Sequence, residues 1–135
     1  MLSKPIVAIA VFAVATGVAS AQEPRAGGSL LFAYSPGCSH CAYQRPIVDR
    51  FRAAHENVKV TKAVHSNLTP VQEQLIAGTS GHPVMVFHAG GCKRQVVGET
   101  ALAELEKEYE TFKRDCLVAN APTKTERVGS GVICR

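Results

Sequence analysis

The sequence predicts one α/β domain in which helices flank both faces of a central mixed β-sheet. Three observations lead to this fold class. The chain has 135 residues, a length that suits a single domain with a modest core. Short apolar runs alternate with amphipathic stretches along the chain. Such alternation is typical of βαβ units, and the order of elements predicted here is β-α-β-α-β-β-α.

The first 21 residues are expected to be a signal peptide that takes no part in the fold. Lys4 supplies a positive charge, Pro5 to Val18 is almost wholly apolar, and Ala19-Ser20-Ala21 has the small residues of a cleavage site. The apolar run is shorter than the ~20 residues of a membrane-spanning helix, which favours a cleaved leader over an uncleaved membrane anchor. We therefore predict a periplasmic or secreted protein, beginning with a flexible segment at residues 22–28.

The first half of the domain is predicted to contain two strands and a helix. Ser29–Tyr34 is a continuous apolar run, which is typical of a strand buried on both faces. From Ser39 to Ala54 apolar residues recur at helical spacing, and Pro46 lies inside this helix and should kink it. Residues 57–64 alternate between polar and apolar, which predicts a second strand.

The second half is predicted to contain a helix, a hairpin and a final helix. Thr69–Gly78 begins with a threonine suited to the N-cap and a proline suited to the first helical position. Val84–His88 and Arg94–Val97 are expected to form a β-hairpin around a turn at residues 89–91. Thr100–Arg114 has a charged side and an apolar stripe, so it is expected to be an amphipathic helix.

The charge pattern argues against nucleic-acid binding. The formal net charge of the whole chain is +4 at pH 7. The leader carries one charged residue, so the mature chain is only mildly basic. Its lysines and arginines form no run of five or more and do not alternate with aromatic residues. A basic surface for nucleic acid is therefore not predicted.

The motif Cys38-Ser39-His40-Cys41 stands where the first strand gives way to the first helix. Unpaired backbone N–H groups at a helix N-terminus favour a negative sulfur at Cys38, and the thiolate is the reactive form of cysteine. Cys41, one turn later, could release a mixed disulfide by closing a bond to Cys38. A protonated His40 would stabilise the thiolate further and make the disulfide a stronger oxidant. We predict that Cys38 attacks, Cys41 resolves and His40 tunes.

Three other interpretations of this motif stay open. A structural disulfide between Cys38 and Cys41 would close only a short loop and would stabilise the fold little. The two thiols could bind a metal with His40 or a remote ligand, although the chain has no second ligand pair at the spacing of a zinc site. His40 could also be a surface residue without effect on the thiol.

Three features of the chain match a known fold family. Ser29–Tyr34 leads into the Cys-x-x-Cys motif, Pro46 follows Cys41 by five residues, and Gly81-His82-Pro83 precedes the third predicted strand. In these features the chain resembles the thioredoxin-fold family over residues 29–115, in a trimmed form. The resemblance implies that Pro83 is cis and faces the disulfide. It also implies that His82 offers its backbone to the substrate and tunes the redox potential; the alternative is that His82 only fills a turn.

The departures from thioredoxin shape the functional prediction. Phe32 stands where thioredoxins have a buried acid, and Gly37 where they have a tryptophan. A histidine before the second cysteine is similar to the periplasmic Dsb proteins and the protein disulfide isomerases. The resemblance implies a thiol–disulfide oxidoreductase, and the expected export together with His40 favours oxidase or isomerase activity over reductase activity. It would need no organic cofactor and no metal.

The expected partners are exported proteins that contain cysteines, and a redox protein that recharges the centre. A monomer is expected. The alternative from another class is a non-enzymatic thioredoxin-like module that binds a partner or carries copper on its two thiols.

The remaining cysteines suggest a tethered tail. The five cysteines are an odd number, so at least one thiol has no partner within the chain. Residues 29–117 are predicted to form the domain and residues 118–135 a tail. A Cys116–Cys134 bridge would pin this tail and is favoured, with Cys92–Cys116 and Cys92–Cys134 as alternatives. In the favoured pairing Cys92 is free and could link two chains into a dimer.

Overall fold

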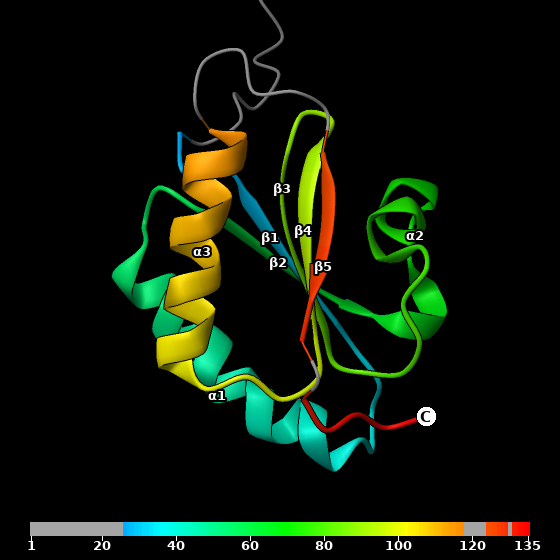
Figure 1. Cartoon of the computed structure of the whole chain (residues 1–135). Coiled ribbons are helices and arrows are strands. Elements are labelled where there is room, and N and C mark those ends of the chain that lie inside the picture. The colour runs from blue at the N-terminus through cyan, green and yellow to red at the C-terminus, as the bar shows by residue number, and fades with distance from the viewer. Residues whose placement is uncertain (1–25, 118–123, 130) are drawn as a thin grey trace, which may run out of the picture.

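The structure is a computed structural model, and it describes residues 26–117, 124–129 and 131–135. The expected signal peptide lies outside the described residues. The elements follow one another as β1, α1, β2, a short 3-10 helix, α2, β3, β4, α3 and β5 (Figure 1). The predicted α/β fold, with a mixed sheet flanked by helices, is confirmed. In the described part of the chain no helix is both long and apolar enough to cross a membrane.

Five strands form one sheet in the spatial order β2-β1-β3-β4-β5. Their bounds are Ser29–Tyr34 for β1, Lys59–Val64 for β2, Val84–Ala89 for β3, Cys92–Val97 for β4 and Thr125–Val128 for β5. The pairs β2–β1 and β4–β5 are parallel, whereas β1–β3 and β3–β4 are antiparallel. β1 thus lies inside the sheet, which explains why its sequence is apolar on both faces.

Helices cover both faces of this sheet. The helices are α1 (Ser39–Ala54), α2 (Pro70–Ile76), α3 (Leu102–Cys116) and the 3-10 turn His65–Asn67. Figure 1 shows α1 and α3 on one face and α2 on the other. Successive side chains of a strand point to opposite faces. Leu30 and Phe32 accordingly belong to the cluster with α1 and α3, and Leu31 and Ala33 to the cluster with α2.

The larger of the two clusters is built around aromatic rings. Phe51 of α1 and Phe87 of β3 each pack against Tyr109 of α3, with ring centroids 5.3 and 5.4 Å apart. Phe112 lies 5.7 Å from Phe87. The Tyr109 hydroxyl donates a hydrogen bond of 3.1 Å to the Gly27 carbonyl, so even this buried polar group has a partner. This cluster packs α1 and α3 against the sheet, and α1 carries the Cys-x-x-Cys motif.

The segment predicted as an irregular tail contains the fifth strand. β5 pairs with β4 in parallel, from Lys93 opposite Thr125 to Val96 opposite Val128. Arg94 forms ion pairs with Glu126 of β5 and with Glu108 of α3. β5 is a sheet edge with alternating exposure, and its four residues include one apolar side chain. A pattern this short and polar does not indicate a strand by itself. The strand forms because its backbone pairs with β4.

Candidate active site

Cys38 lies at the N-cap of α1, where the motif predicted a helix start. Its sulfur accepts a hydrogen bond from the Cys41 backbone N–H at 3.4 Å. The preceding Gly37 has a φ of +83°, a left-handed conformation that glycine adopts without a steric penalty. This turn takes the chain from the end of β1 into the helix. The sulfur of Cys38 therefore sits against the unpaired amides of the first helical turn, which favour its thiolate form.

The partner of Cys38 in the structure is Cys134, 96 residues along the chain, with the two Cα atoms 6.1 Å apart. Cys41 is free and buried. The second disulfide joins Cys92 to Cys116, with a Cα separation of 5.6 Å. The favoured Cys116–Cys134 pairing is therefore wrong, and one of the alternatives, Cys92–Cys116, is the pair found. Cys92 has no free thiol in this state with which to link two chains.

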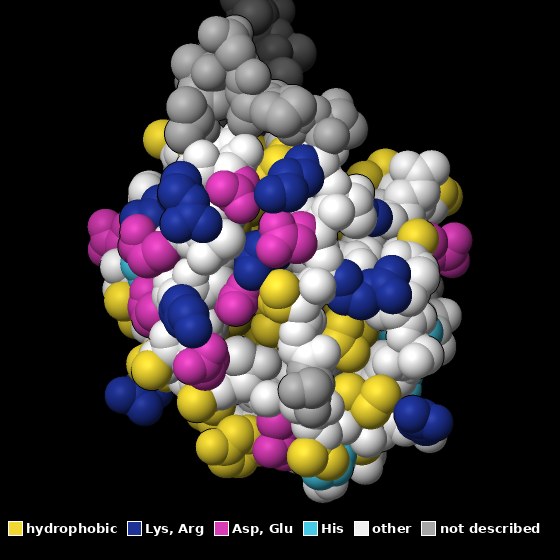
Figure 2. Space-filling model, viewed as in Figure 1, with side chains coloured by type: hydrophobic (Ala, Val, Ile, Leu, Met, Phe, Trp, Pro, Cys, Tyr) yellow, Lys and Arg dark blue, Asp and Glu magenta, His cyan; other side chains and the backbone are white. Residues whose placement is uncertain are grey.

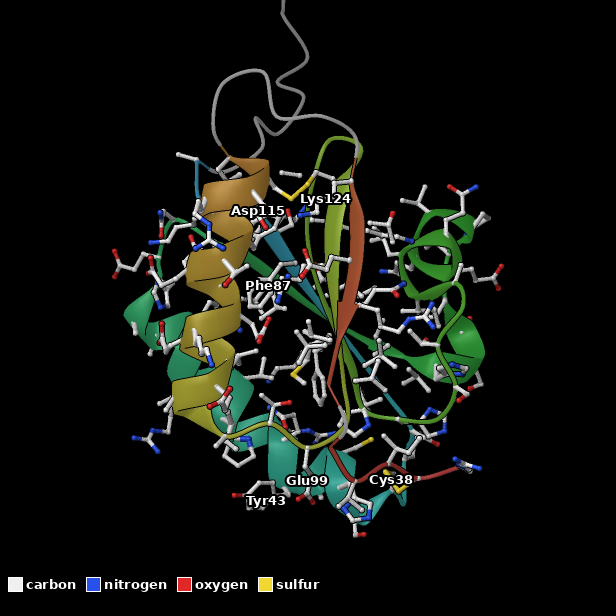
Figure 3. The ribbon with its side chains drawn as sticks, in the orientation of Figure 1. Cys38, Tyr43, Phe87, Glu99, Asp115 and Lys124 are labelled. Atoms are coloured by element: carbon white, nitrogen blue, oxygen red, sulfur yellow. A yellow bond between two sulfur atoms is a disulfide. The ribbon has the colours of Figure 1, made fainter. Side chains whose placement is uncertain are left out.

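The reason for the different pairing is the direction of β5. Cys116 ends α3, and Figure 3 shows a disulfide near the Asp115 label at one end of the sheet. Cys38 lies at the opposite end, near Glu99. β5 runs parallel to β4 and carries the chain away from the Cys116 end. Cys134 is thereby delivered to Cys38, although it is much closer to Cys116 in sequence.

The free thiol of Cys41 is a poor nucleophile at neutral pH. Burial raises the pKa of Cys41 above its ordinary value of 9.0, and the Ser35 backbone and the Arg45 charge offset only part of this rise. The thiolate is the reacting form, so Cys41 reacts only through a small ionised fraction. Thioredoxins carry a buried acid at the position of Phe32. Here the phenyl ring of Phe32 is fully buried and stacks on Tyr34 at 5.5 Å.

His40 is held by a carboxylate from another part of the chain. Its Nδ1 lies 2.6 Å from Oε1 of Glu99, in the loop between β4 and α3. The two side chains are about equally exposed, at 29% and 30%. The contact orients the imidazole. Sequence reasoning missed Glu99, because 59 residues separate it from His40 and no local pattern joins them.

The His82–Pro83 peptide bond is cis, and Pro83 is buried. The backbone of His82 is paired with the C-terminal segment. The His82 N–H donates to the Cys134 carbonyl at 2.9 Å, and the Cys134 N–H donates to the His82 carbonyl at 2.8 Å. The structure therefore brings Cys38, Cys134 and His82 together. The resemblance implied the His82 backbone as a binding position, and here it holds the chain's own cysteine.

The His82 side chain lies beside a second histidine. Its ring is 4.6 Å from the ring of His65, and within the described part of the chain its Nδ1 is buried without a hydrogen-bond partner. Burial first, and then the charge of His65, lower the pKa of His82. The neutral form of the His82 imidazole is therefore favoured.

One further predicted position, Pro46, is placed by the structure. Pro46 lies inside α1, as its spacing predicted. It borders a shallow hollow with Tyr43 and Leu102 beyond the Cys-x-x-Cys motif. As for metals, the described ranges contain no cluster of three or more histidine, cysteine, aspartate or glutamate side chains that could hold an ion.

A comparison with solved structures finds a chloroplastic thioredoxin z that is similar to this chain. The two share 16% sequence identity and superpose with a TM-score of 0.50, over 64% of this chain and 78% of that chain. No model of a protein family matches, and no curated protein matches the sequence. The likeness, together with the element order and the sheet described above, shows that this chain has a thioredoxin-like fold.

Proposed function

We propose that the protein is an exported thiol–disulfide oxidoreductase that exchanges disulfides with cysteine-containing proteins. One observation carries this proposal. Cys38 is an oxidised sulfur at the N-terminus of α1, and Cys41 is a free thiol in the same helical turn. An exchange centre needs an oxidised sulfur and a thiol side by side, because each step is the attack of a thiolate on a disulfide sulfur.

The reaction follows from the two positions. With a Cys38–Cys41 disulfide, a substrate thiolate attacks Cys38 and Cys41 leaves. A second substrate thiolate then attacks the substrate sulfur, and Cys38 leaves as a thiolate stabilised by the α1 amides. Two electrons pass from the substrate dithiol to the centre, and a new substrate disulfide forms. A second disulfide-bearing protein would oxidise the centre again.

Two features favour oxidase or isomerase activity over reductase activity. The helix N-terminus and His40, oriented by Glu99, stabilise the reduced form, which makes the disulfide more oxidising. The raised pKa of Cys41 slows the step that expels a bound substrate. A mixed disulfide then lasts longer, which gives an incorrectly paired substrate time to rearrange before release.

The surface around the centre supports a protein substrate. Tyr43 and Val132 are large apolar side chains that are 55% and 60% exposed, and both come from segments next to the motif cysteines. Figure 2 shows hydrophobic side chains gathered towards the lower end of this face, whereas charged side chains cover the region over α3. An apolar surface beside a redox centre suits transient contact with unfolded or partly folded chains.

Export is part of the proposal and rests on two observations. Residues 1–21 have the pattern of a signal peptide. The Cys92–Cys116 bond lies far from the reacting cysteines, and structural disulfides of this kind persist in oxidising compartments. Fractionation of cells that express the full chain tests this part: mature protein lacking residues 1–21 outside the cytosol is expected.

The activity is tested by refolding a small secreted protein whose disulfides have been scrambled, alongside insulin reduction. Wild-type protein should accelerate refolding, and Cys38→Ser should abolish the effect. A reduction potential of about −120 mV supports an oxidase, whereas one of about −270 mV supports a reductase. Equal activity of Cys38→Ser would contradict catalysis. Stoichiometric Cu(I) binding that this variant loses would instead favour the copper-carrying alternative.

A further inference from the structure

We propose that the chain's own C-terminal segment, Gly131–Arg135, is an internal substrate of the centre, and that Cys134 is a third exchanging cysteine. The segment closes the site to other proteins until Cys41 displaces Cys134 from Cys38. This inference rests on the proposed exchange function and extends it. In this proposal the Cys38–Cys134 bond is an internal mixed disulfide that can exchange, and not a permanent structural bond.

Backbone hydrogen bonds hold the segment as an extended peptide. Besides the two bonds between Cys134 and His82, the Glu99 N–H donates to the Val132 carbonyl at 3.0 Å. The segment therefore binds through its main chain, as an added strand binds to an exposed edge. Main-chain binding of this kind suits any extended peptide, and the two loops that provide it flank Cys38.

Glycines give the segment a close seat. A Cβ on Gly81 would lie 2.5 Å from the Cys134 carbonyl oxygen and 2.7 Å from Cδ1 of Ile133. Gly98 and Gly131 are packed so closely that a Cβ on either would collide with the other loop's backbone. The close contact between the segment and the two loops therefore requires glycine on both sides. This packing indicates a specific binding position for the segment.

The sulfur of Cys134 occupies the position that a substrate sulfur would take on Cys38. β5 anchors the segment, because its last pair to β4 is Val128 opposite Val96. A short tether keeps the local concentration of Cys134 at about the millimolar level. A substrate at micromolar concentration competes poorly with such a tethered cysteine.

The opening step is an internal exchange that needs no oxidant. The Cys41 thiolate attacks Sγ of Cys38, the Cys38–Cys134 bond breaks, and Cys134 leaves as a thiolate. The proton lost by Cys41 is replaced by one taken up at Cys134, so one disulfide and one thiol are present before and after. The products are a Cys38–Cys41 disulfide and a released segment that no longer covers the His82 backbone.

The first experiment maps the disulfides of the full chain by acid quench, alkylation and mass spectrometry, across a series of glutathione buffers. We expect wild-type protein to contain both Cys38–Cys134 and Cys38–Cys41. Cys41→Ser should retain only the former and Cys134→Ser only the latter. If wild-type protein contains Cys38–Cys134 alone in every buffer while Cys134→Ser forms Cys38–Cys41, then Cys38–Cys134 is a structural bond and the inference is wrong.

The second experiment tests whether the segment Gly131–Arg135 competes with a peptide for Cys38. The probe is the acetylated peptide Gly-Val-Ile-Cys-Arg as its glutathione disulfide, and the host is Cys41→Ser/Cys134→Ser, in which Cys38 is the exchanging thiol. Adding Gly131→Val should displace the segment from its binding position. The equilibrium yield of peptide bonded to Cys38 should then rise about tenfold, because one or two competing hydrogen bonds are lost. Adding Val71→Ala is the control, because that valine is 67% exposed on α2 and lies outside the C-terminal segment.

The outcomes separate the two proposals. A higher yield with Gly131→Val and no change with Val71→Ala supports the internal substrate. Equal yields in the host and in both triple variants contradict the internal substrate but leave exchange at Cys38 intact. If the peptide joins Cys38 in none of these proteins, exchange at Cys38 fails and the internal substrate fails with it.

Discussion

Gln44 and Thr100 are joined by two hydrogen bonds that fix the active-site loop to the active-site helix. The Gln44 amide donates to the Thr100 carbonyl at 3.1 Å, and the Thr100 N–H donates to the Gln44 carbonyl oxygen at 2.7 Å. Gln44 is fully buried, three residues beyond Cys41. The neighbouring Glu99 contacts both His40 and Val132. One loop thus links the motif helix to the C-terminal segment.

Replacing Gln44 by leucine should destabilise the fold. Leucine keeps the volume but leaves the Thr100 N–H and carbonyl without their partner, and each buried unsatisfied group is costly. We expect a loss of about 2–4 kcal/mol in the free energy of unfolding, measured by urea denaturation. Gln74→Leu, an exposed glutamine of α2, is the control and should change stability by less than about 0.5 kcal/mol. Equal effects of the two substitutions would contradict the role of this contact.

Removing the Cys92–Cys116 bond should weaken the fold but preserve exchange. The bond joins residues 24 apart, and the chain-entropy estimate for such a loop is about 3 kcal/mol. We expect Cys92→Ala/Cys116→Ala to lose about that much stability in urea and to retain refolding activity at a temperature where it stays folded. Loss of activity in the folded variant would show that this bond takes part in the redox cycle.

The conversion of Cys38–Cys134 to Cys38–Cys41 should accelerate with pH. Burial raises the pKa of Cys41 above 9.0, so below that pH the thiolate fraction, and with it the rate, grows about tenfold per unit. Quenching and alkylating Cys134 as it is released measures this rate. A rate that is flat between pH 6 and about pH 9 would contradict attack by Cys41.

A charge variant checks the same step. The Arg45 charge lowers the pKa of Cys41, so Arg45→Gln should raise that pKa and slow the release of Cys134 a few-fold at pH 8. Arg50→Gln also removes a positive charge from an exposed position on α1 and should leave the rate unchanged. Equal slowing by both variants would indicate a general effect of net charge.

Local patterns in the sequence were sufficient for the order of most elements and for the position of Cys38. The apolar run of β1, the helical spacing after Ser39 and the proline at the start of α2 act over a few residues. The start of α1 follows from the same short-range rules. The prediction that Cys38 begins a helix therefore needed no knowledge of distant contacts.

Only the tertiary structure decided what Cys38 is bonded to. The sequence analysis favoured Cys116–Cys134 because that bridge would pin the tail to the domain, and that pairing was wrong. The partner of Cys134 depends on β5, a polar edge strand that exists only because β4 pairs with it. Disulfides form between residues that the fold brings within reach, and here the fold carries Cys134 past the nearer cysteine to the start of α1.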